Sequence, residues 1–459
     1  MSDRSADPRR VAYEVLSAVE DSDAYANLLL PVRLERTGLS GADAAFATEL
    51  VYGTLRLRGY YERVVELAAR RPASAIARGT LRVLLLGAHQ LLGMRTPAHA
   101  AVDRSVRLQR AVAGERATGF VNAVLRAVGA ADPEQWRARV GDSARSERER
   151  KALLSAHPEW IVDAFGAALA AEGRAGELDE LLEADNVPPR LNLALLPGAA
   201  DEALLPPGAE PSGVSPVGRV LPGGDPGALV RASAGAIRVQ DAGSQLVALT
   251  LARARPVAAG ERWLDLCAGP GGKAALLGAE ARIGGARLLA NEAVPARVEL
   301  VRRSVAAVED AVELRTGDGR LIADAVEGFA PGGFDRILLD APCTGLGALR
   351  RRPEARWRKS AEDLAELTVL QGELLRAAAG VLAPGGLLLY ATCSPHLAET
   401  RAAVDSALAE SGLRELDARA IAEGIAPQPL GLAGGTRSVQ LWPHRNSTDA
   451  MFFALLTRG

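Results

Sequence analysis

Three cysteines are the residues of this sequence that most directly suggest a reactive site. Cys267, Cys343 and Cys393 are the only cysteines among 459 residues, and all three lie in the second half of the chain. No pair has C-x-x-C spacing, so the sequence predicts neither a disulfide framework nor a zinc site, and no metal is expected. A thiolate is a nucleophile, whereas a single buried cysteine is most often a small core residue. The neighbours of each cysteine must decide between these two interpretations.

The first cysteine lies in a glycine-rich motif, LDLCAGPGGKAA, residues 264–275. The pattern predicts a strand that ends at Cys267, a tight turn, and a helix that begins at Lys273. Glycine lets a backbone approach a ligand closely, and the start of a helix offers free N–H donors. Ala274 stands where a Walker A loop has Ser or Thr, so a magnesium-dependent phosphate loop is not expected. An ordinary strand-to-helix turn remains the alternative at this point.

Carboxylates follow the next two predicted strands. Glu292 ends ARLLANE, roughly twenty residues further on, where an acid can bind two ribose hydroxyls. Asp318 follows the third strand in RTGDGR, near the expected place of an adenine edge. A single acid before glycine is usually a turn residue. Three such positions in strand order nevertheless favour a site for a nucleoside cofactor.

The other two cysteines follow two further apolar strands. Asp340 and Cys343 lie in DRILLDAPCTGLGALRRRPEARW, with Pro342 fixing the backbone between them, and Cys393 lies in LYATCSPHLAET. Because the carboxyl ends of parallel strands meet at one edge of a sheet, we expect two thiols and a carboxylate to converge on one cleft. A hydride-transfer enzyme does not need this set, so S-adenosylmethionine is favoured over a nicotinamide cofactor.

Methylation of carbon 5 of a pyrimidine does need such a set. Carbon 5 of cytosine is a poor nucleophile, so an enzyme first adds a thiolate to carbon 6, which makes carbon 5 able to attack a sulfonium methyl group. An acid or a hydrogen bond at N3 eases this addition. Loss of the C5 proton then expels the thiolate. The site is expected to lower the pKa of the attacking thiol.

Alternating strands and helices from about residue 240 predict a doubly wound, mainly parallel sheet that would position these residues. The expected strands are RWLDLC, ARLLANE, AVELRTGD, DRILLDAP and GGLLLYATCS. The expected helices cover residues 273–281, 295–308, 361–382 and 399–409. VLAPGG is expected to stop the third helix before the last strand, and SVQLWP and MFFALLTR are expected to pair antiparallel.

The N-terminal part of the chain has a different pattern. Between residue 8 and about 140, apolar residues recur at three- and four-residue spacing, as in RRVAYEVLSAVE and RGTLRVLLLGAHQLLG, which predicts an all-helical domain. Short strands RLNLALL and GAIRVQ among Pro- and Gly-rich segments predict a connector and a small α+β subdomain. The expected division is 1–140, 141–238 and 239–459.

Composition narrows the class of protein. The chain has 48% hydrophobic and 24% charged residues and a net charge of -2, which indicates a soluble globular protein without an overall basic signal. The start MSDRSADPRR has no apolar segment for secretion, and no apolar run is long enough to span a bilayer. A cytoplasmic protein without a membrane partner is therefore expected.

A basic run surrounds Trp357 just after the predicted active-site loop. Such a run is usually a solvated surface. Beside a site that must accept an unstacked base, contacts with RNA phosphates are expected instead. The run consists of Arg350, Arg351, Arg352, Arg356, Arg358 and Lys359.

The motifs LDLCAGPGGKA, DAPCTGLGALRRRPEARW and YATCSPHLAE closely resemble those of RNA cytosine-5 methyltransferases of the NOL1/NOP2/Sun family. RRVAYEVL, ELVYGTLR and FVNAVLRA resemble a NusB-type RNA-binding domain. VQDAGSQLVA and LWPHRNSTDAMFFALL also match, so the resemblance spans nearly the whole chain and is weakest through 195–235. It implies a multidomain fold: an all-α NusB-like domain, a small α+β connector and an α/β Rossmann-like class I methyltransferase domain.

The resemblance also implies a function and a set of site residues. The expected reaction moves a methyl group from S-adenosyl-L-methionine to carbon 5 of a cytidine in small-subunit (16S) ribosomal RNA, catalysed by a monomer. The family's Thr-Cys-Ser cysteine, here Cys393, is its nucleophile. The Asp-Ala-Pro-Cys cysteine, here Cys343, helps to release the product, and Asp340 would contact the base or the cofactor. The cofactor-binding residues implied are Cys267, Ala268, Gly269, Pro270, Gly271, Gly272, Lys273, Glu292, Arg297, Asp318 and Asp340.

One departure and two alternatives remain. HRNSTDAMFF stands where the family more often has Gly-x-Asp-Gly, although Asp449 is kept. Methylation of an exocyclic amine or a protein side chain would use the same cofactor without a thiol. A non-catalytic RNA-binding protein would rest on the helical domain alone. His396 follows Cys393 closely, but a surface-loop histidine is the expected interpretation.

Overall fold

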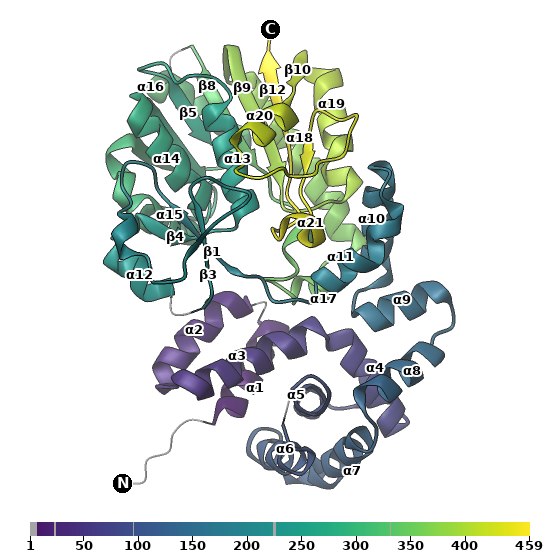
Figure 1. Ribbon diagram of the computed structural model, residues 1–459. Helices are drawn as coiled ribbons and strands as arrows, with labels where there is room; N and C mark the ends of the chain where they lie inside the picture. The colour runs from purple at the N-terminus through teal and green to yellow at the C-terminus, as the bar shows by residue number, and fades with distance from the viewer. Residues whose placement is uncertain (1–6, 23, 95, 224–225, 331) are drawn as a thin grey trace. The chain divides into compact units, whose positions relative to one another are not determined.

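The computed structural model describes residues 7–22, 24–94, 96–223, 226–330 and 332–459 (Figure 1). Its described residues form two compact units. Unit 1 contains those up to Asp163, with Leu182–Val187 and Leu349–Arg358. Unit 2 contains those of Ala164–Leu181, Pro188–Ala348 and Lys359–Gly459. The three-part division at residues 140 and 238 stays a prediction, because compactness divides the chain in another way.

Unit 1 is helical, which confirms the all-α prediction for this region. Helix α5 (Arg78–Leu92) packs against α1, α3, α4, α6 and α7 and is buried on most of its surface. Asp7 caps α1 by accepting a hydrogen bond from the Arg9 N–H, and Asp132 forms a capping box with Gln135 at α8. The other helices are α1 (Pro8–Asp21), α2 (Ala26–Thr37), α3 (Gly41–Arg56), α4 (Arg58–Ala69), α6 (Ala98–Val112), α7 (Thr118–Gly129), α8 (Pro133–Asp142) and α9 (Glu147–Ser155).

A small antiparallel sheet precedes the catalytic part of unit 2. Its order is β2-β3-β1-β4, from β1 (Leu191–Leu195), β2 (Glu210–Pro211), β3 (Gly218–Leu221) and β4 (Ile237–Val239). The expected strands RLNLALL and GAIRVQ correspond to β1 and β4, which pair antiparallel. Helices α10 (Glu159–Ala171) and α11 (Leu178–Ala184) precede this sheet, and α12 (Pro226–Ala232) lies between β3 and β4. The predicted small α+β subdomain is therefore present.

The main sheet of unit 2 has the order β10-β12-β9-β8-β5-β6-β7. Its strands β5 to β9 pair in parallel, whereas β12 is antiparallel to β9, β10 and the short β11. The strands are β5 (Arg262–Asp265), β6 (Arg287–Glu292), β7 (Val312–Thr316), β8 (Phe334–Asp340), β9 (Leu382–Thr392), β10 (Leu413–Leu416), β11 (Val439–Gln440) and β12 (Phe452–Arg458). All five predicted parallel strands and the C-terminal antiparallel pair are confirmed.

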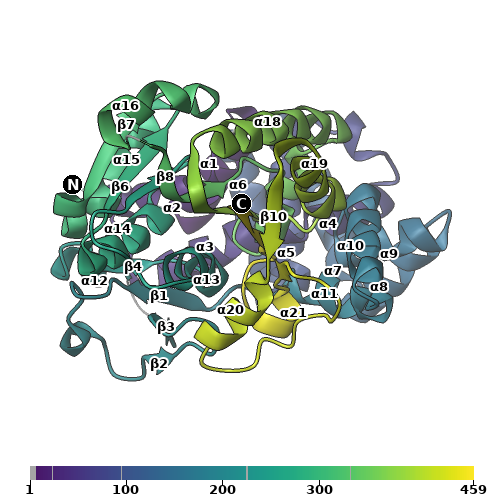
Figure 2. The same cartoon turned by 90° about the horizontal axis from the view of Figure 1, so that it is seen from above.

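Helices cover both faces of the main sheet. Alternate residues of each strand enter two separate cores: Trp263 and Leu338 face one side, and Leu264 and Leu339 face the other. Figure 2 shows α13 (Ala242–Arg253), α14 (Gly272–Gly284) and α20 (Ala418–Ile425) on one side of the strands, and α18 (Ala361–Gly380) and α19 (Arg401–Ser411) on the other. Helix α15 (Pro295–Val305) follows β6.

The order of the strands indicates where a ligand-binding crevice of this sheet lies. Strand order runs from β5 outward to β6 and β7 on one side, and to β8 and β9 on the other. The crossover direction therefore reverses between β5 and β8, and ligands of open α/β sheets bind at the carboxyl ends beside such a switch point. The segment after β5 is the predicted glycine loop, and Asp340 ends β8.

The expected stop at VLAPGG is wrong in one respect. Helix α18 ends at Gly380, but strand β9 already begins at Leu382 and contains Pro384. Phe334 pairs with Leu382 and Arg336 with Leu387, so β9 has extra residues in a bulge at this point. Gly385 has a φ of 68°, which a bulge accommodates and a regular strand does not.

Candidate active site at the carboxyl ends of β5, β8 and β9

Two thiols lie side by side at the ends of neighbouring strands. Cys343 follows β8, Cys393 follows β9, and their Sγ atoms are 3.5 Å apart. The two strands are parallel and in register to the end, with Asp340 beside Ala391. The Gly347 N–H also donates to the Cys393 carbonyl oxygen at 2.8 Å, which holds the loop after Cys343 against the end of β9. The expected convergence of the thiols is confirmed, and their roles stay predictions.

Lys273 and Asp340 form an ion pair in the same crevice. The Lys273 Nζ lies 2.9 Å from Asp340 Oδ2, and the lysine side chain is 12% exposed. Burial lowers the pKa of Lys273, but the charge and the hydrogen bond of Asp340, and the charges that Cys393 and Asp265 carry when they are ionised, act in the other direction, and the net shift is upward. Lys273 therefore stays charged and places a cation near the thiols.

The two thiols differ in electrostatic environment. The hydrogen bond with Cys393, burial, and the charges of Cys393 and Glu399 raise the pKa of Cys343 well above its usual value. A negative Cys393, in contrast, interacts favourably with Lys273. A single negative charge on the pair is therefore expected to reside on Cys393, while Cys343 keeps its proton.

A buried polar network lies beneath Cys343, and the sequence did not reveal it. Glu399 is fully buried, and its carboxylate accepts hydrogen bonds from the N–H and hydroxyl of Thr344 at 2.8 and 2.5 Å. Gln371 donates to the same carboxylate at 3.1 Å, and the Tyr390 hydroxyl donates to the Glu399 carbonyl oxygen at 2.7 Å. In the sequence, the one indication of this network is Glu399, the acid at the end of YATCSPHLAE.

The glycine loop is joined to Glu292 and Arg297. Glu292 Oε2 accepts from the Gly269 N–H and Oε1 from the Val294 N–H, both at 3.0 Å. Arg297 donates to the Gly269 carbonyl oxygen at 2.8 Å. A Cβ on Gly269 would lie 2.1 Å from Glu292 Oε2, so the cradle requires glycine there. The predicted loop, the acid that ends β6 and the arginine of α15 are thus joined by hydrogen bonds.

The rest of the loop is held by hydrogen bonds to β6 and α15. The Ala268 N–H donates to the Asn291 carbonyl oxygen at 2.8 Å, and the Ser304 hydroxyl donates to the Pro270 carbonyl oxygen at 2.7 Å. Gly271 has a φ of 105°, and a Cβ there would lie 2.4 Å from Ser304 Cβ. Gly272 begins α14. These contacts fix the conformation of the loop.

Asp265, the last residue of β5, is a buried acid that the sequence-based site omitted. It is 1% exposed, and neither carboxylate oxygen makes a hydrogen bond of good geometry among the described residues, although the Cys267 N–H is close enough to lower its pKa. Burial, with the charge of Asp340, raises the pKa of Asp265 to about 8. A buried acid without a partner is costly unless a ligand satisfies it. S-adenosylmethionine carries an ammonium group and two ribose hydroxyls. The carboxyl group of Asp265 suits the ammonium group, and that of Glu292 suits the ribose hydroxyls.

Two of the predicted cofactor-binding residues, Asp318 and Cys267, have surroundings in the structure that limit what their side chains can do. The Asp318 carboxylate pairs with Arg320 at 2.6 Å and accepts from the Arg320 N–H at 2.9 Å, so an adenine edge would compete with Arg320 for it. Burial raises the pKa of the Cys267 thiol far above its usual value, which makes this thiol unreactive. The proposed contribution of Cys267 is therefore its backbone.

His396 is not simply an exposed loop residue, which corrects the expectation. Its side chain is partly buried, and Nδ1 accepts a hydrogen bond from the Ala398 N–H at 3.2 Å, at the start of a short 3₁₀ helix (Leu397–Glu399). Burial lowers its pKa. His396 therefore acts as a cap for the segment that carries Glu399.

The basic run belongs largely to unit 1 and is partly buried. Arg356 is fully buried and donates to the carbonyl oxygens of Arg56, Ala156 and Asp185 and to Asn186 Oδ1, at 2.7–3.2 Å. Arg358 donates to two carbonyl oxygens of unit 1, and Trp357 packs on Gly59. The expectation that the run binds RNA phosphates is therefore wrong for Arg356, because its guanidinium is enclosed by backbone carbonyls.

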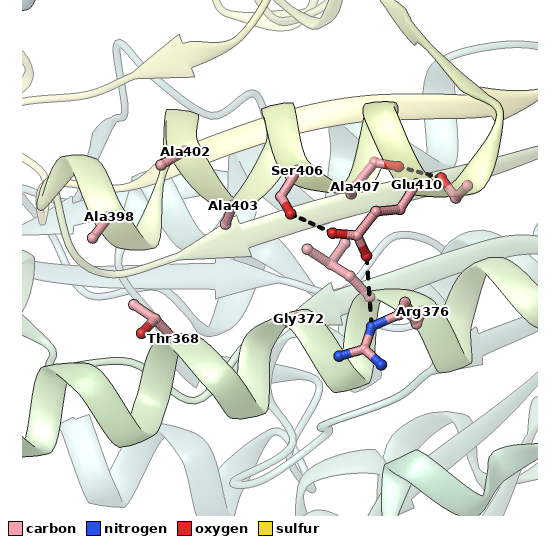
Figure 3. A pocket seen from close by; sticks show the side chains of 11 residues that line it. Thr368, Gly372, Arg376, Ala398, Ala402, Ala403, Ser406, Ala407 and Glu410 are labelled. Carbon is pink, nitrogen blue, oxygen red and sulfur yellow. Dashed lines mark hydrogen bonds and ion pairs between the residues drawn. The ribbon is translucent and has the colours of Figure 1, made fainter.

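Two grooves lie outside this site. The groove between α18 and α19 has a volume of about 240 Å³ (Figure 3). It is lined by small side chains such as Ala402 and Ala403, and its charged pair is Arg376 with Glu410, 3.8 Å apart. A groove of about 380 Å³ between α6 and α7 in unit 1 contains His99, Asn122 and Arg126. Neither groove contains a cysteine.

Known families match both parts of the chain. Residues 254–457 match the model of the 16S rRNA methyltransferase RsmB/F family, and residues 6–130 match the NusB family. A putative methyltransferase of Mycobacterium tuberculosis (Rv1407) is 47% identical, over 99% of this chain and 97% of its own length. Ribosomal RNA small subunit methyltransferase B of Pseudomonas syringae pv. tomato is 32% identical, over 98% of this chain and 97% of its own length.

Solved structures share the fold. The crystal structure of PH0851 has a TM-score of 0.79 and 20% identity, and the match covers 99% of this chain and all of that one. A methyltransferase homologue from Pyrococcus horikoshii has a TM-score of 0.52 and 20% identity, covering 69% of this chain and all of its own. None of the described helices is both long and apolar enough to cross a membrane.

Proposed function

This chain belongs to the RsmB/F family of S-adenosylmethionine-dependent RNA cytosine-5 methyltransferases, and we propose that it methylates carbon 5 of a cytidine in 16S ribosomal RNA through a covalent adduct with Cys393. The observation that carries this proposal is the pair of thiols 3.5 Å apart, beside an ion pair of Lys273 with Asp340. Methylation of an amine or of a protein side chain requires no thiol. A ring carbon that must first be activated requires one.

The first step is addition. The Cys393 thiolate forms a bond to carbon 6, and the electron pair of the C5=C6 double bond moves into the ring toward N3 and O2. The Lys273 ammonium is near enough to Cys393 to stabilise both the thiolate and the charge that develops on the ring. Asp340 holds Lys273 in place and offers a carboxylate oxygen to the polar edge of the base.

The second step is methyl transfer. Carbon 5 forms a bond to the methyl carbon with the electron pair held by the ring, and S-adenosylmethionine, when bound, would supply that methyl group, its sulfur keeping the electron pair of the broken S–CH3 bond. The residues of the chain bind and orient the cofactor. Glu292 and the glycine loop form the ribose side of the cradle, and Asp265 provides an anion for the ammonium group.

The third step is release. A base removes the C5 proton, the C–H electron pair re-forms the C5=C6 bond, and the C6–S pair returns to Cys393. Once Cys393 is an uncharged thioether, one cause of the raised pKa of Cys343 is gone, so Cys343 loses its proton to solvent more easily and then accepts the C5 proton. Each turnover releases one proton, and both cysteines return to their starting states.

The helical unit supports RNA as the partner. Residues 6–130 match the NusB family, and an RNA methyltransferase needs contacts outside its catalytic crevice to choose one cytidine. Ribosomal RNA as the target, a monomeric enzyme and a cytoplasmic location are parts of the same proposal. Relatives at 32% identity that carry the small-subunit name support the 16S target.

Mapping of 5-methylcytidine tests the substrate. Bisulfite sequencing of 16S and 23S ribosomal RNA and of transfer RNA would compare the parent strain with a strain that lacks the gene. We expect one cytidine of 16S ribosomal RNA to lose its methyl group, and to regain it with the wild-type gene but not with Cys393→Ala. Loss of methylation in another RNA class, with 16S ribosomal RNA unchanged, would contradict the proposed substrate.

A further inference from the structure

We propose that Glu399 is a positioning residue that fixes Cys343 beside Cys393, and that it governs release of the RNA adduct more than its formation. This inference rests on the proposed function. Glu399 itself touches neither substrate nor cofactor in this account. It acts through the peptide that carries Cys343.

The Glu399 carboxylate holds the residue that follows Cys343. Oε1 accepts from the Thr344 N–H at 2.8 Å, and Oε2 accepts from the Thr344 hydroxyl at 2.5 Å. Glu399 is fully buried and Thr344 is 2% exposed, so water does not compete for these bonds. Hydrogen bonds to a buried charge are among the strongest that a protein makes.

The residue before Cys343 is held by the same network. Gln371 Nε2 donates to the Pro342 carbonyl oxygen at 2.8 Å and to Glu399 Oε1 at 3.1 Å. Tyr390 donates from its hydroxyl to the Glu399 carbonyl oxygen at 2.7 Å and lies 3.3 Å from Gln371 Oε1. Both peptide neighbours of Cys343 are thus attached to one pair, Glu399 and Gln371.

Cys393 has a different support. It follows β9, whose last residue Thr392 pairs with Phe452 of β12, and the Thr392 hydroxyl donates to the Ser394 carbonyl oxygen at 3.0 Å. The sheet therefore supports Cys393 directly, whereas Glu399 reaches this segment indirectly, through the Thr344 hydroxyl, which lies 3.1 Å from the Ser394 hydroxyl. Loss of the Glu399 bonds is expected to displace Cys343 first and to leave the nucleophile close to its place.

Glu399→Gln is the first variant, and Glu410→Gln is its matched control. Glu399 lies just before α19, and Glu410 lies within α19. Glu410 lines the surface groove of Figure 3 and pairs with Arg376 at 3.8 Å. Thr344→Val is the second variant. It removes the hydroxyl that binds Oε2 and that also lies 3.1 Å from the Ser394 hydroxyl, and it keeps the size of the side chain, so it serves where Glu399→Gln fails to fold.

The experiment measures formation and release separately. Each variant is incubated with 16S ribosomal RNA and S-adenosylmethionine, and the covalent RNA–protein band on a denaturing gel is compared with multiple-turnover methylation. We expect the Glu399 and Thr344 variants to accumulate adduct and to lose turnover by about tenfold or more, because a hydrogen bond to a buried charge is worth about one order of magnitude in rate. Glu410→Gln should behave like the wild type in both measurements.

Several outcomes decide the matter. Wild-type turnover in Glu399→Gln or Thr344→Val would overturn the inference, and so would an equal loss of adduct formation and release. Unchanged affinity for S-adenosylmethionine and an unchanged melting temperature show that the fold is kept. Cys343→Ala separates a failure of the proposed function from a failure of this inference. If Cys343→Ala forms no adduct, the proposed function itself is contradicted. If Cys343→Ala accumulates adduct but Glu399→Gln and Thr344→Val do not, only the role of Glu399 is contradicted.

Discussion

Cys343 and Cys393, with Sγ atoms 3.5 Å apart, differ in their surroundings. The hydrogen bond with Cys393, burial and the charges of Cys393 and Glu399 raise the pKa of Cys343, whereas Lys273 attracts a negative Cys393. This difference supports the proposal that Cys393 is the nucleophile. A thiol that keeps its proton is a poor attacking group, and a thiol beside an ammonium is a good one. The predictions below test parts of this assignment.

Lys273→Met should slow formation of the RNA adduct by about tenfold or more, because the ammonium near Cys393 is lost. Lys359→Met is the control, since Lys359 pairs with Asp363 at 3.9 Å on the surface of α18. The rate of appearance of the covalent band in a Cys343→Ala background measures the step directly. An unchanged rate in Lys273→Met would show that the cation does not activate Cys393.

Gly269→Ala should weaken binding of S-adenosylmethionine by about tenfold or more, because a new Cβ 2.1 Å from Glu292 Oε2 displaces the acid or the loop. Gly424→Ala in α20 is the control from the same unit, since a Cβ there would have no atom within 4 Å and Gly424 is not among the predicted cofactor-binding residues. Titration calorimetry measures both affinities. Equal affinities in the two variants would refute the cradle described for Glu292.

Binding of the cofactor is expected to change the protonation of Asp265. Its pKa is raised from 3.8 to about 8, so the folded protein carries a protonated Asp265 at neutral pH, and this residue's contribution to stability falls as pH rises between these two values. A bound ammonium group favours the ionised form, so binding at pH 7 should release a proton.

Calorimetry in buffers of different ionisation enthalpy measures that release. Asp265→Asn, which cannot ionise, should abolish it and weaken binding, and should also flatten the loss of unfolding free energy between pH 4 and pH 8. The same proton release in Asp265→Asn and in the wild type would assign the proton to another group.

Arg356→Ala should destabilise unit 1 by roughly 2–4 kcal/mol, because it leaves several buried carbonyl oxygens without a donor. Arg352→Ala is the control from the same basic run, since Arg352 is exposed and stacks on Tyr25 at 5.6 Å. That change should stay within about 0.5 kcal/mol. Chemical denaturation measures both. A stable Arg356→Ala with a weaker salt dependence of RNA binding would instead restore the phosphate-contact interpretation.

Much of the catalytic part follows from local sequence. Apolar runs that end in an acid, a cysteine or glycines indicate buried parallel strands, and the strand ends of such a sheet meet at one edge. For this reason Cys343, Cys393 and Asp340 could be expected in one crevice. Glu292 and the glycine loop follow from the same logic, because both lie where a strand ends.

The remaining features depend on packing between distant segments. Thr344 and Glu399 are 55 residues apart, and only the packing of the segment before α19 against the β8 loop brings them together. Arg356 looks like part of a solvated charge run, and its burial becomes evident only when Leu349–Arg358 is found within unit 1. Asp265 looks like the usual acid at a strand end, and nothing local indicates that its carboxylate lacks a partner.

The central claim is that Cys393 attacks the base and that Cys343 releases it. The most direct measurement is mass spectrometry of the peptide that remains attached to RNA after Cys343→Ala is incubated with 16S ribosomal RNA and S-adenosylmethionine. The account predicts a stable adduct through Cys393 that carries the transferred methyl group, and no adduct in Cys343→Ala with Cys393→Ala. Normal turnover of Cys393→Ala, or an adduct of the wild-type enzyme through Cys343, would contradict it.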